Sequence, residues 1–438
     1  MEAASEAGTI LLRPRPYARL SGALLLLPLL PQPTPLKPLP GEIWTEIFRC
    51  ALQSDPQDIG ETTRTLLTVC KAFKDTVLPL VYSRVTISHV SALERFYTRL
   101  HQADQKWDSI RRIPYSTPGR WVQALDLSTL MFTGQSQALQ LDSLLTALFP
   151  LVPFLSRLSM NPAFVLSRRA VRSLADREGA RNLRVLDGLS YVPTSPLTPV
   201  RDDHLVALLK CCPNLEELEV IGHGPDPAEL DLLSDGLWSL QVEADVLQPD
   251  EPLSLPRLHT LTLLSMFTSP VMTHLLHSPL PSLRKLTVTP YADLPYPASL
   301  VSQFIQVHGP GLRSLHMYTP KSWPTRLHPA PDTLLQTSPH LRHLTLENPV
   351  PYLILTAEHP LRILAFPRPT PECWQMLEKL SPQLPRLQIV RIRDVRWLRK
   401  GMTSRAQEAG VQGEMKEWKR RLARKRIRIV DADWNDQD

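Results

Sequence analysis

The sequence predicts an α/β fold in which a small helical unit at the N-terminus precedes an irregular solenoid of repeats, with a parallel sheet on the concave face. Three observations predict it. Short helical runs with apolar faces occupy residues 39–82, and a segment of pattern L-x-x-L-x-L recurs from residue 121 onward. The chain also holds 44 prolines among 438 residues, about twice the usual share of ~5%, which disfavours long uninterrupted helices.

The first 38 residues predict a disordered, proline-rich leader. They hold seven prolines, and "PQPTPLKPLP" follows the apolar run Ala23–Leu30. That run follows three arginines, as in a secretory signal peptide, but Pro28 interrupts it and no small-residue cleavage site follows. It is also shorter than the roughly 18 apolar residues that a membrane span needs. We therefore favour an unprocessed leader and keep a secretory signal as the alternative.

The first ordered element is expected to be a helix that begins just after Pro40. Its apolar face is formed by Ile43, Ile47, Phe48, Ala51 and Leu52. Turn-forming residues at 54–60 end it.

A second helical run covers residues 62–82, and Pro79 is expected to kink or split it. The alternating "RVTIS" at 84–88 then predicts a short strand. Helices this short bury little apolar surface, so an exposed apolar face turned toward a partner is expected.

These residues resemble an F-box, in the form common among fungal F-box proteins. The resemblance covers about 45 residues and is carried by Leu39, Pro40, Glu42, Ile43, Ile47, Phe48, Val69, Cys70, Lys71, Phe73, Val81 and Tyr82. It implies docking on the Skp adaptor of a cullin-RING ubiquitin ligase. The implied adaptor-binding residues are Leu39, Pro40, Ile43, Ile47, Val69 and Phe73. The alternative is a helical cap on the array that follows, because apolar helix faces are more often core than interface.

The repeats behind this unit resemble a leucine-rich-repeat solenoid. Their leading leucines stand at 155, 183, 215, 258, 283, 312, 341, 361 and 387, and a degenerate unit at Leu237–Val242 would shorten the longest interval. Each L-x-L predicts a short parallel strand with its leucines turned inward, and "DDHLVALLK" at Asp202–Lys210 predicts an outer helix. A proline before many strands stops that outer helix. Strands of a doubly wound sheet are the alternative, although no phosphate-binding turn accompanies them.

We therefore expect five regions. They are the leader at 1–38, an F-box at 39–84, a linker or first solenoid cap at 85–120, the solenoid at 121–400, and a C-terminal capping helix and strand with a basic run at 401–438.

The sequence contains no motif that predicts catalysis. G-x-S-x-G, G-x-G-x-x-G, the phosphate-binding loop and H-E-x-x-H are all missing. His204, Cys211, Cys212 and His223 could form a metal cluster by composition, but vicinal cysteines close a tetrahedral zinc site poorly, so structural cysteines are favoured. We expect a protein without enzymatic activity, cofactor or metal.

The outward residues of the predicted strands form a candidate partner-binding face that runs from acidic to basic. Its candidate substrate-binding residues are Asp187, Glu217, Glu219, Lys285, His316, Tyr318, His343, Glu347, Arg391 and Arg393. A solvated sheet face without a binding role is the alternative for any one of them.

The formal net charge of +6 belongs to the C-terminal segment, because residues 391–428 hold 14 Lys and Arg against 4 Asp and Glu. Val411, Met415, Trp418 and Leu422 form an apolar stripe among these charges, which predicts a capping helix, and "RIRIVDA" predicts a last strand. The alternative is a nuclear-import signal or a patch that binds nucleic acid. No general footprint for nucleic acid extends along the chain.

The sequence thus predicts a noncatalytic F-box receptor whose leucine-rich repeats hold a target protein near a Skp-cullin-F-box ubiquitin ligase. A leucine-rich-repeat scaffold unconnected to ubiquitin is the alternative. Five cysteines without a disulfide framework favour the cytoplasm or the nucleus, and no membrane contact is expected.

Overall fold

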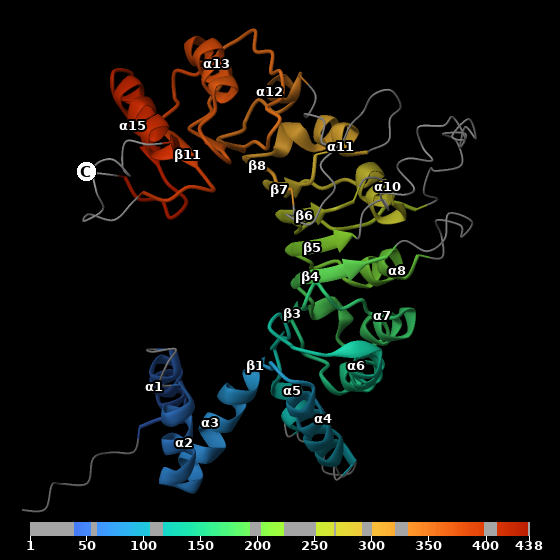
Figure 1. Ribbon diagram of the computed structural model, residues 1–438. Helices are drawn as coiled ribbons and strands as arrows, with labels where there is room; N and C mark the ends of the chain where they lie inside the picture. The colour runs from blue at the N-terminus through green and yellow to red at the C-terminus, as the bar shows by residue number, and fades with distance from the viewer. Residues whose placement is uncertain are drawn as a thin grey trace, which may run out of the picture. The chain divides into compact units, whose positions relative to one another are not determined.

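A computed structural model describes residues 39–53, 59–105, 117–192, 203–222, 251–266, 269–290, 300–319, 332–397 and 410–436 (Figure 1). The chain divides into two compact units, Met1–Leu80 and Val81–Asp438. The leader at 1–38 and the degenerate repeat at Leu237–Val242 lie outside the described residues. No helix in the described ranges combines the length and the apolar character that a membrane span requires.

The first unit contains helix α1 (Gly41–Gln53), helix α2 (Ile59–Val69) and most of helix α3 (Lys71–Ser83). Helix α1 begins where it was expected, because the Pro40 carbonyl accepts hydrogen bonds from the backbone N–H groups of Ile43, at 3.1 Å, and Trp44, at 3.3 Å.

The second helical run does not split at Pro79, which was one of the two expected outcomes. The run divides at Cys70, and Pro79 lies inside α3. The Sγ atom of Cys70 accepts a hydrogen bond from the Phe73 N–H at 3.5 Å, which satisfies one of the free amide groups at the start of α3. A side-chain acceptor at this position favours a new helix start, and a proline near a helix end costs only one backbone hydrogen bond.

The second unit confirms the predicted α/β fold with a parallel sheet. In the described part of the chain, twelve strands form one sheet in which every strand pairs in parallel with the next strand in sequence. They are β1 (Arg84–Thr86), β2 (Ala124–Asp126), β3 (Arg157–Ser159), β4 (Val185–Tyr191), β5 (Glu217–Gly222), β6 (Thr260–Leu264), β7 (Lys285–Val288), β8 (Ser314–Met317), β9 (His343–Thr345), β10 (Ile363–Phe366), β11 (Ile389–Ile392) and β12 (Arg428–Val430). An order that follows the sequence without crossovers is typical of a repeat solenoid and excludes the doubly wound alternative.

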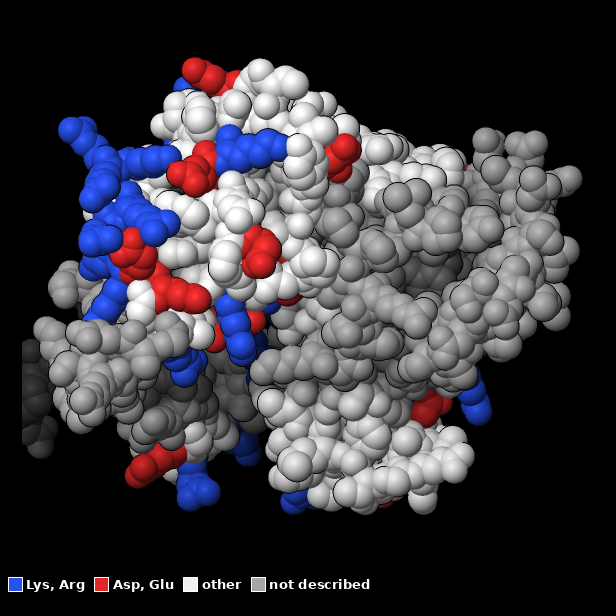
Figure 2. Space-filling view, turned by 45° about the horizontal axis from the view of Figure 1, so that its top comes forward, with Lys and Arg blue, Asp and Glu red and all other residues white. Residues whose placement is uncertain are grey.

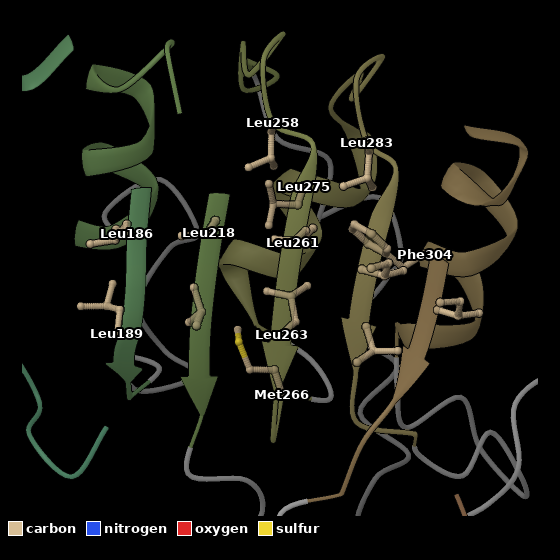
Figure 3. Close-up of a cluster of buried hydrophobic side chains, with 14 of the residues drawn as sticks. Leu186, Leu189, Leu218, Leu258, Leu261, Leu263, Met266, Leu275, Leu283 and Phe304 are labelled. Carbon is tan, nitrogen blue, oxygen red and sulfur yellow. The ribbon is translucent and has the colours of Figure 1, made fainter. Parts of the chain in front are cut away.

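The middle leucine of each repeat stands opposite its counterpart on the neighbouring strands. Leu158 pairs with Leu186, Leu186 with Leu218, and the register continues through Leu261 and Leu286. All of these leucines are at most 1% exposed. Figure 3 shows Leu186, Leu218 and Leu261 of the strands in one cluster with Leu275 and Phe304 of the helices. The repeats therefore share one continuous core, which each of them would be too small to form alone.

The helices cover the leucine side of the sheet, and the strands line the inner side of the curve that this unit forms (Figure 1). They are α4 (Val90–Gln105), α5 (Pro118–Trp121), α6 (Gly134–Leu148), α7 (Arg168–Ala175), α8 (His204–Cys211), α10 (Pro270–His277), α11 (Val301–His308), α12 (Leu334–Thr337), α13 (Pro371–Leu380) and α15 (Gly410–Ala423). The expected outer helix at Asp202–Lys210 is α8. Its N-cap Asp203 accepts hydrogen bonds from the N–H groups of Leu205 and Val206, and the Tyr191 hydroxyl donates to the same carboxylate at 2.6 Å.

Helix α15 and strand β12 lie at the end of the sheet that follows β11. Met415, Trp418 and Leu422 of the apolar stripe are buried, and the Trp418 ring contacts the rings of Phe366 and Trp374. Figure 2 shows Lys and Arg side chains gathered over this end of the molecule.

Candidate functional site

The first unit exposes four large apolar side chains on α1 and at the end of α2. Leu39 and Ile43 are each 47% exposed, Ile47 is 43% exposed and Val69 is 57% exposed. We call these four residues the apolar surface. All four were predicted from the sequence to contact the adaptor.

An aromatic cluster joins helices α1 and α3 within the first unit. The Phe48 ring is buried and stands 4.7 Å from the Phe73 ring and 5.5 Å from the Trp44 ring, measured between centroids. The Trp44 and Phe73 rings are 5.1 Å apart. Phe73 therefore takes part in this cluster, whereas Ile43 and Ile47 do not reach the core that Phe48 enters.

The outward residues of the strands lie on the face of the sheet opposite the leucines, which we call the sheet face. Two rows can be followed from strand to strand. Glu217, Thr260, Lys285, Ser314 and His343 are in register in one row. In the second row, Glu219 is in register with Thr262, Thr287, His316 and Thr345. Register thus brings seven of the ten predicted substrate-binding residues onto one surface. The other three, Tyr318, Glu347 and Arg393, follow the ends of β8, β9 and β11.

The early strands carry an acidic group of residues on the sheet face. Asp126, Ser159 and Asp187 are in register, and Glu217 and Glu219 belong to the next strand. Burial raises the pKa of Asp187, and the neighbouring Glu217 raises it further. Burial also raises the pKa of Glu219, with a further rise from Asp187. These carboxylates repel one another, so a cationic partner group placed between them would be stabilised.

A glycine shapes this acidic group. The pairing of β4 with β5 shifts register between Leu186 and Leu189, and Gly188 within the shift has a φ of +67°. A Cβ atom at this position would lie 2.3 Å from the Met160 carbonyl oxygen. Only glycine therefore allows the bulge that separates Asp187 from the regular rows.

Two histidines occupy the middle of the sheet face. The His316 and His343 rings are 4.5 Å apart, and the Ser314 hydroxyl lies 2.8 Å from His316 Nε2. Burial lowers the pKa of His316 to about 3 and that of His343 to about 4. The neighbouring His343 lowers the pKa of His316 further, and the Arg391 guanidinium lowers that of His343 further. Both imidazoles are neutral at neutral pH, so the predicted acidic-to-basic gradient owes its positive charge to lysine and arginine.

The aromatic residue Trp434 joins the sheet face from the C-terminal segment. Its ring is 4.4 Å from the Arg391 guanidinium carbon and 6.2 Å from the His343 ring, and 46% of the residue is exposed. Arg391 also donates a hydrogen bond to the Ala432 carbonyl at 2.6 Å. Sequence reasoning missed Trp434 because it lies beyond the last repeat; its only signal is a bulky aromatic in an acidic, polar tail.

Glu347 and Arg393 form an ion pair at 2.6 Å, with side chains only 11% and 20% exposed. Glu347 also accepts a hydrogen bond from the Thr319 N–H, and the Arg393 guanidinium lies 5.5 Å from the Tyr318 ring centre. Two of the predicted binding residues therefore neutralise each other, which leaves Tyr318, 38% exposed, as the member of this group that presents a free surface.

The suggested metal cluster gains no support from the geometry. Cys212 is buried and burial raises its pKa to about 12, whereas Cys211 is exposed. His223 lies outside the described residues. Within the described ranges, no group of three His, Cys, Asp or Glu residues is placed to hold a metal ion.

Comparison with known proteins adds little to this picture. No family model matches the sequence, and no curated protein matches it. A chain in the crystal structure of the Rad7 and Elc1 complex from yeast is similar at 12% identity, with a TM-score of 0.32 over 83% of this chain and 90% of that one. A score of this size says nothing about activity or partners. The description of this protein as an α/β repeat solenoid therefore depends on its own sheet.

Proposed function

We propose that this chain is a noncatalytic F-box substrate receptor. In this proposal residues 39–84 bind a Skp-family adaptor of a cullin-RING ubiquitin ligase, and the leucine-rich-repeat region, residues 121–400, binds a target protein. The receptor raises the effective concentration of the target near the ligase and performs no chemistry of its own. It acts in the cytoplasm or the nucleus.

The observation that carries the proposal is the apolar surface of the first unit. Leu39, Ile43, Ile47 and Val69 are exposed although the same helices bury Phe48. A helical unit that served only as an internal cap would be expected to bury such residues. Several large apolar side chains exposed on one small folded unit are typical of protein interfaces.

The sheet face supports the second half of the proposal. Trp434, Tyr318 and Arg391 provide the residue types that dominate binding energy in protein interfaces, and the half-buried carboxylates lie on the same face. The face extends over parallel strands from successive repeats, which is typical of solenoids that bind extended partners.

Co-purification with a Skp adaptor tests the proposal. Ile43→Lys with Ile47→Lys should lower adaptor binding by more than about tenfold, because each change places a charge in an apolar contact. Replacing Leu39 and Pro40 by alanine should weaken binding in the same direction. Leu139→Lys is the matched control, since Leu139 is 63% exposed on α6 of the second unit.

Circular dichroism of each variant should match that of the original protein, because the substituted side chains are exposed. Adaptor binding that survives the double substitution, or an original protein that captures no adaptor, would contradict the F-box assignment and favour a scaffold unconnected to ubiquitin.

A further inference from the structure

Four arginines occupy equivalent positions on successive repeats, one residue before each strand begins. We call Arg284, Arg313, Arg342 and Arg362 the arginine ladder. The Arg284 carbonyl accepts the Arg313 N–H at 2.8 Å, the Arg313 carbonyl accepts the Arg342 N–H at 2.8 Å, and the Arg342 carbonyl accepts the Arg362 N–H at 2.8 Å. Since neighbouring strands lie about 4.8 Å apart, the four side chains start at a regular spacing along one edge of the sheet.

These side chains line one pocket of about 400 Å³. Arg386 of the following repeat also lines it, and the remaining walls come from Pro310, Gly311, His340 and Pro360. All five arginines are exposed, so the pocket is open to solvent. The pocket belongs to the second unit alone and lies at the start of the strands, away from the side chains of the sheet face.

The positive charge of the pocket is uncompensated within the described residues. No carboxylate lines it, and none of its five arginines forms an ion pair there. The Arg284 guanidinium donates to the Gly311 carbonyl at 3.2 Å and to the Leu283 carbonyl at 3.4 Å, and both acceptors are uncharged. Like charges held this close repel one another, so an anion in the pocket would be stabilised by several of them together.

An earlier repeat also has an arginine at the equivalent position, but a carboxylate lies beside it and compensates its charge. The Arg184 carbonyl accepts the Glu216 N–H at 2.7 Å, which places these two residues on the same edge in the same way. There the Arg184 guanidinium lies 3.4 Å from the Glu216 carboxylate. The uncompensated charge is therefore confined to the repeats that begin with Arg284.

We propose that the arginine ladder binds phosphoryl groups, several of them carried on one extended ligand. Guanidinium groups recognise phosphoryl oxygens through paired N–H donors, and a row of them fits a row of such oxyanions better than a single small anion. No Phe, Tyr or Trp side chain lines the pocket, and its one aromatic ring is the imidazole of His340, whereas single-stranded nucleic acids are usually held by stacking on several aromatic side chains. This proposal is independent of adaptor binding.

Calorimetric titration of the full-length protein at physiological salt tests it. Inorganic tripolyphosphate should bind more tightly than pyrophosphate, and pyrophosphate more tightly than phosphate, because longer anions reach more arginines. Arg313→Ala with Arg342→Ala should weaken tripolyphosphate binding by at least about tenfold. Arg313→Lys with Arg342→Lys keeps the charge, removes the paired donors and should weaken binding by an intermediate factor.

Two controls separate this site from general attraction by positive charge. Arg184→Ala removes an arginine from the same ladder position where a carboxylate compensates it, and Arg424→Ala removes an exposed arginine just after α15. Each should change the affinity by less than about twofold. Equal weakening in the controls and in the ladder variants, or no binding of tripolyphosphate at millimolar concentration, would overturn the proposal.

A peptide with two phosphoserines, compared with the same peptide carrying serines, distinguishes the source of the phosphoryl groups. Binding that requires the phosphoserines and is lost in the ladder variants assigns the site to phosphorylated side chains. Tripolyphosphate binding without peptide binding assigns it to a free polyphosphorylated ligand. Either result supports the proposed chemistry.

Discussion

Gly188 illustrates how one residue controls the local geometry of the sheet face. Its positive φ and the nearby Met160 carbonyl leave no room for a side chain. Gly188→Ala should lower the free energy of unfolding by more than the roughly 1 kcal/mol that a positive φ alone costs an alanine. Gly134→Ala is the matched control, because Gly134 has a φ of +72° but no atom within 4 Å of the added Cβ.

Urea denaturation of the two variants measures this difference. Equal losses of stability in Gly188→Ala and Gly134→Ala would show that the contact with Met160 relaxes at no cost.

The paired histidines give the fold a dependence on pH. In the folded protein the pKa of His316 is about 3 and that of His343 about 4, against an ordinary value of 6.5. The unfolded chain therefore binds more protons between these values, so stability is complete above about pH 6.5 and falls as the pH drops toward 4. Each histidine contributes a slope of at most about 1.4 kcal/mol per pH unit.

The half-buried carboxyls Asp187 and Glu219 change the stability with the opposite sign, because their pKa values are raised in the folded state. The informative quantity is therefore the difference between the original protein and His316→Gln with His343→Gln. Urea denaturation at a series of pH values from 4 to 7 should show that the free energy of unfolding falls less steeply with decreasing pH in the variant. Identical slopes would mean that neither imidazole is shielded from protons in the fold.

At the scale of elements, strands β4 and β5 carry the carboxylates that are the best candidates for contact with a target protein. Glu217→Lys with Glu219→Lys should change which proteins are captured and leave thermal stability within about 0.5 kcal/mol, because the substitutions remove repulsion around Asp187. Affinity purification with mass spectrometry measures the first effect and a melting curve measures the second.

Glu251→Lys reverses an exposed charge outside the strands, and it should leave the captured proteins unchanged. A large loss of melting temperature in the double variant would show that the two glutamates are structural.

Sequence periodicity predicted the strands well because each depends on a local pattern. The alternation of buried leucines with outward residues determines which face of each strand is buried, and parallel pairing then stacks equivalent residues. The break at Cys70 was missed because helix starts depend on individual side-chain hydrogen bonds.

At the scale of the whole molecule, the C-terminal segment completes the core of the second unit. Met415, Trp418, Leu422 and Ile429 are buried, and β12 pairs with β11. Deleting residues 411–438 should expose these apolar contacts and the edge of β11, and so cause aggregation. Size-exclusion chromatography with light scattering measures the outcome.

Arg424→Ala with Lys425→Ala in the full-length chain is the control for loss of charge alone, and it should remain monomeric. A truncated protein that stays monomeric and equally stable but no longer enters the nucleus would identify the basic run as an import signal.

The sequence by itself determined the class of fold, the order of the strands and the face on which each outward residue lies. These follow from the short-range spacing of apolar residues, which can be seen within each single repeat. The resemblance to an F-box also singled out Leu39, Ile43, Ile47 and Val69, which the structure leaves exposed.

Only the tertiary structure decided which of these residues contact one another and which of their charges are neutralised. Register brought Asp126 to the acidic group, the segments that follow β9 and β11 brought Glu347 to Arg393, and the chain's return after β12 placed Trp434 on Arg391. Such contacts join residues that are far apart in sequence, so their distances depend on the stacking of the repeats and on no local pattern. The same stacking places the four arginines of the arginine ladder, which come from four different repeats, in one continuous row of positive charge.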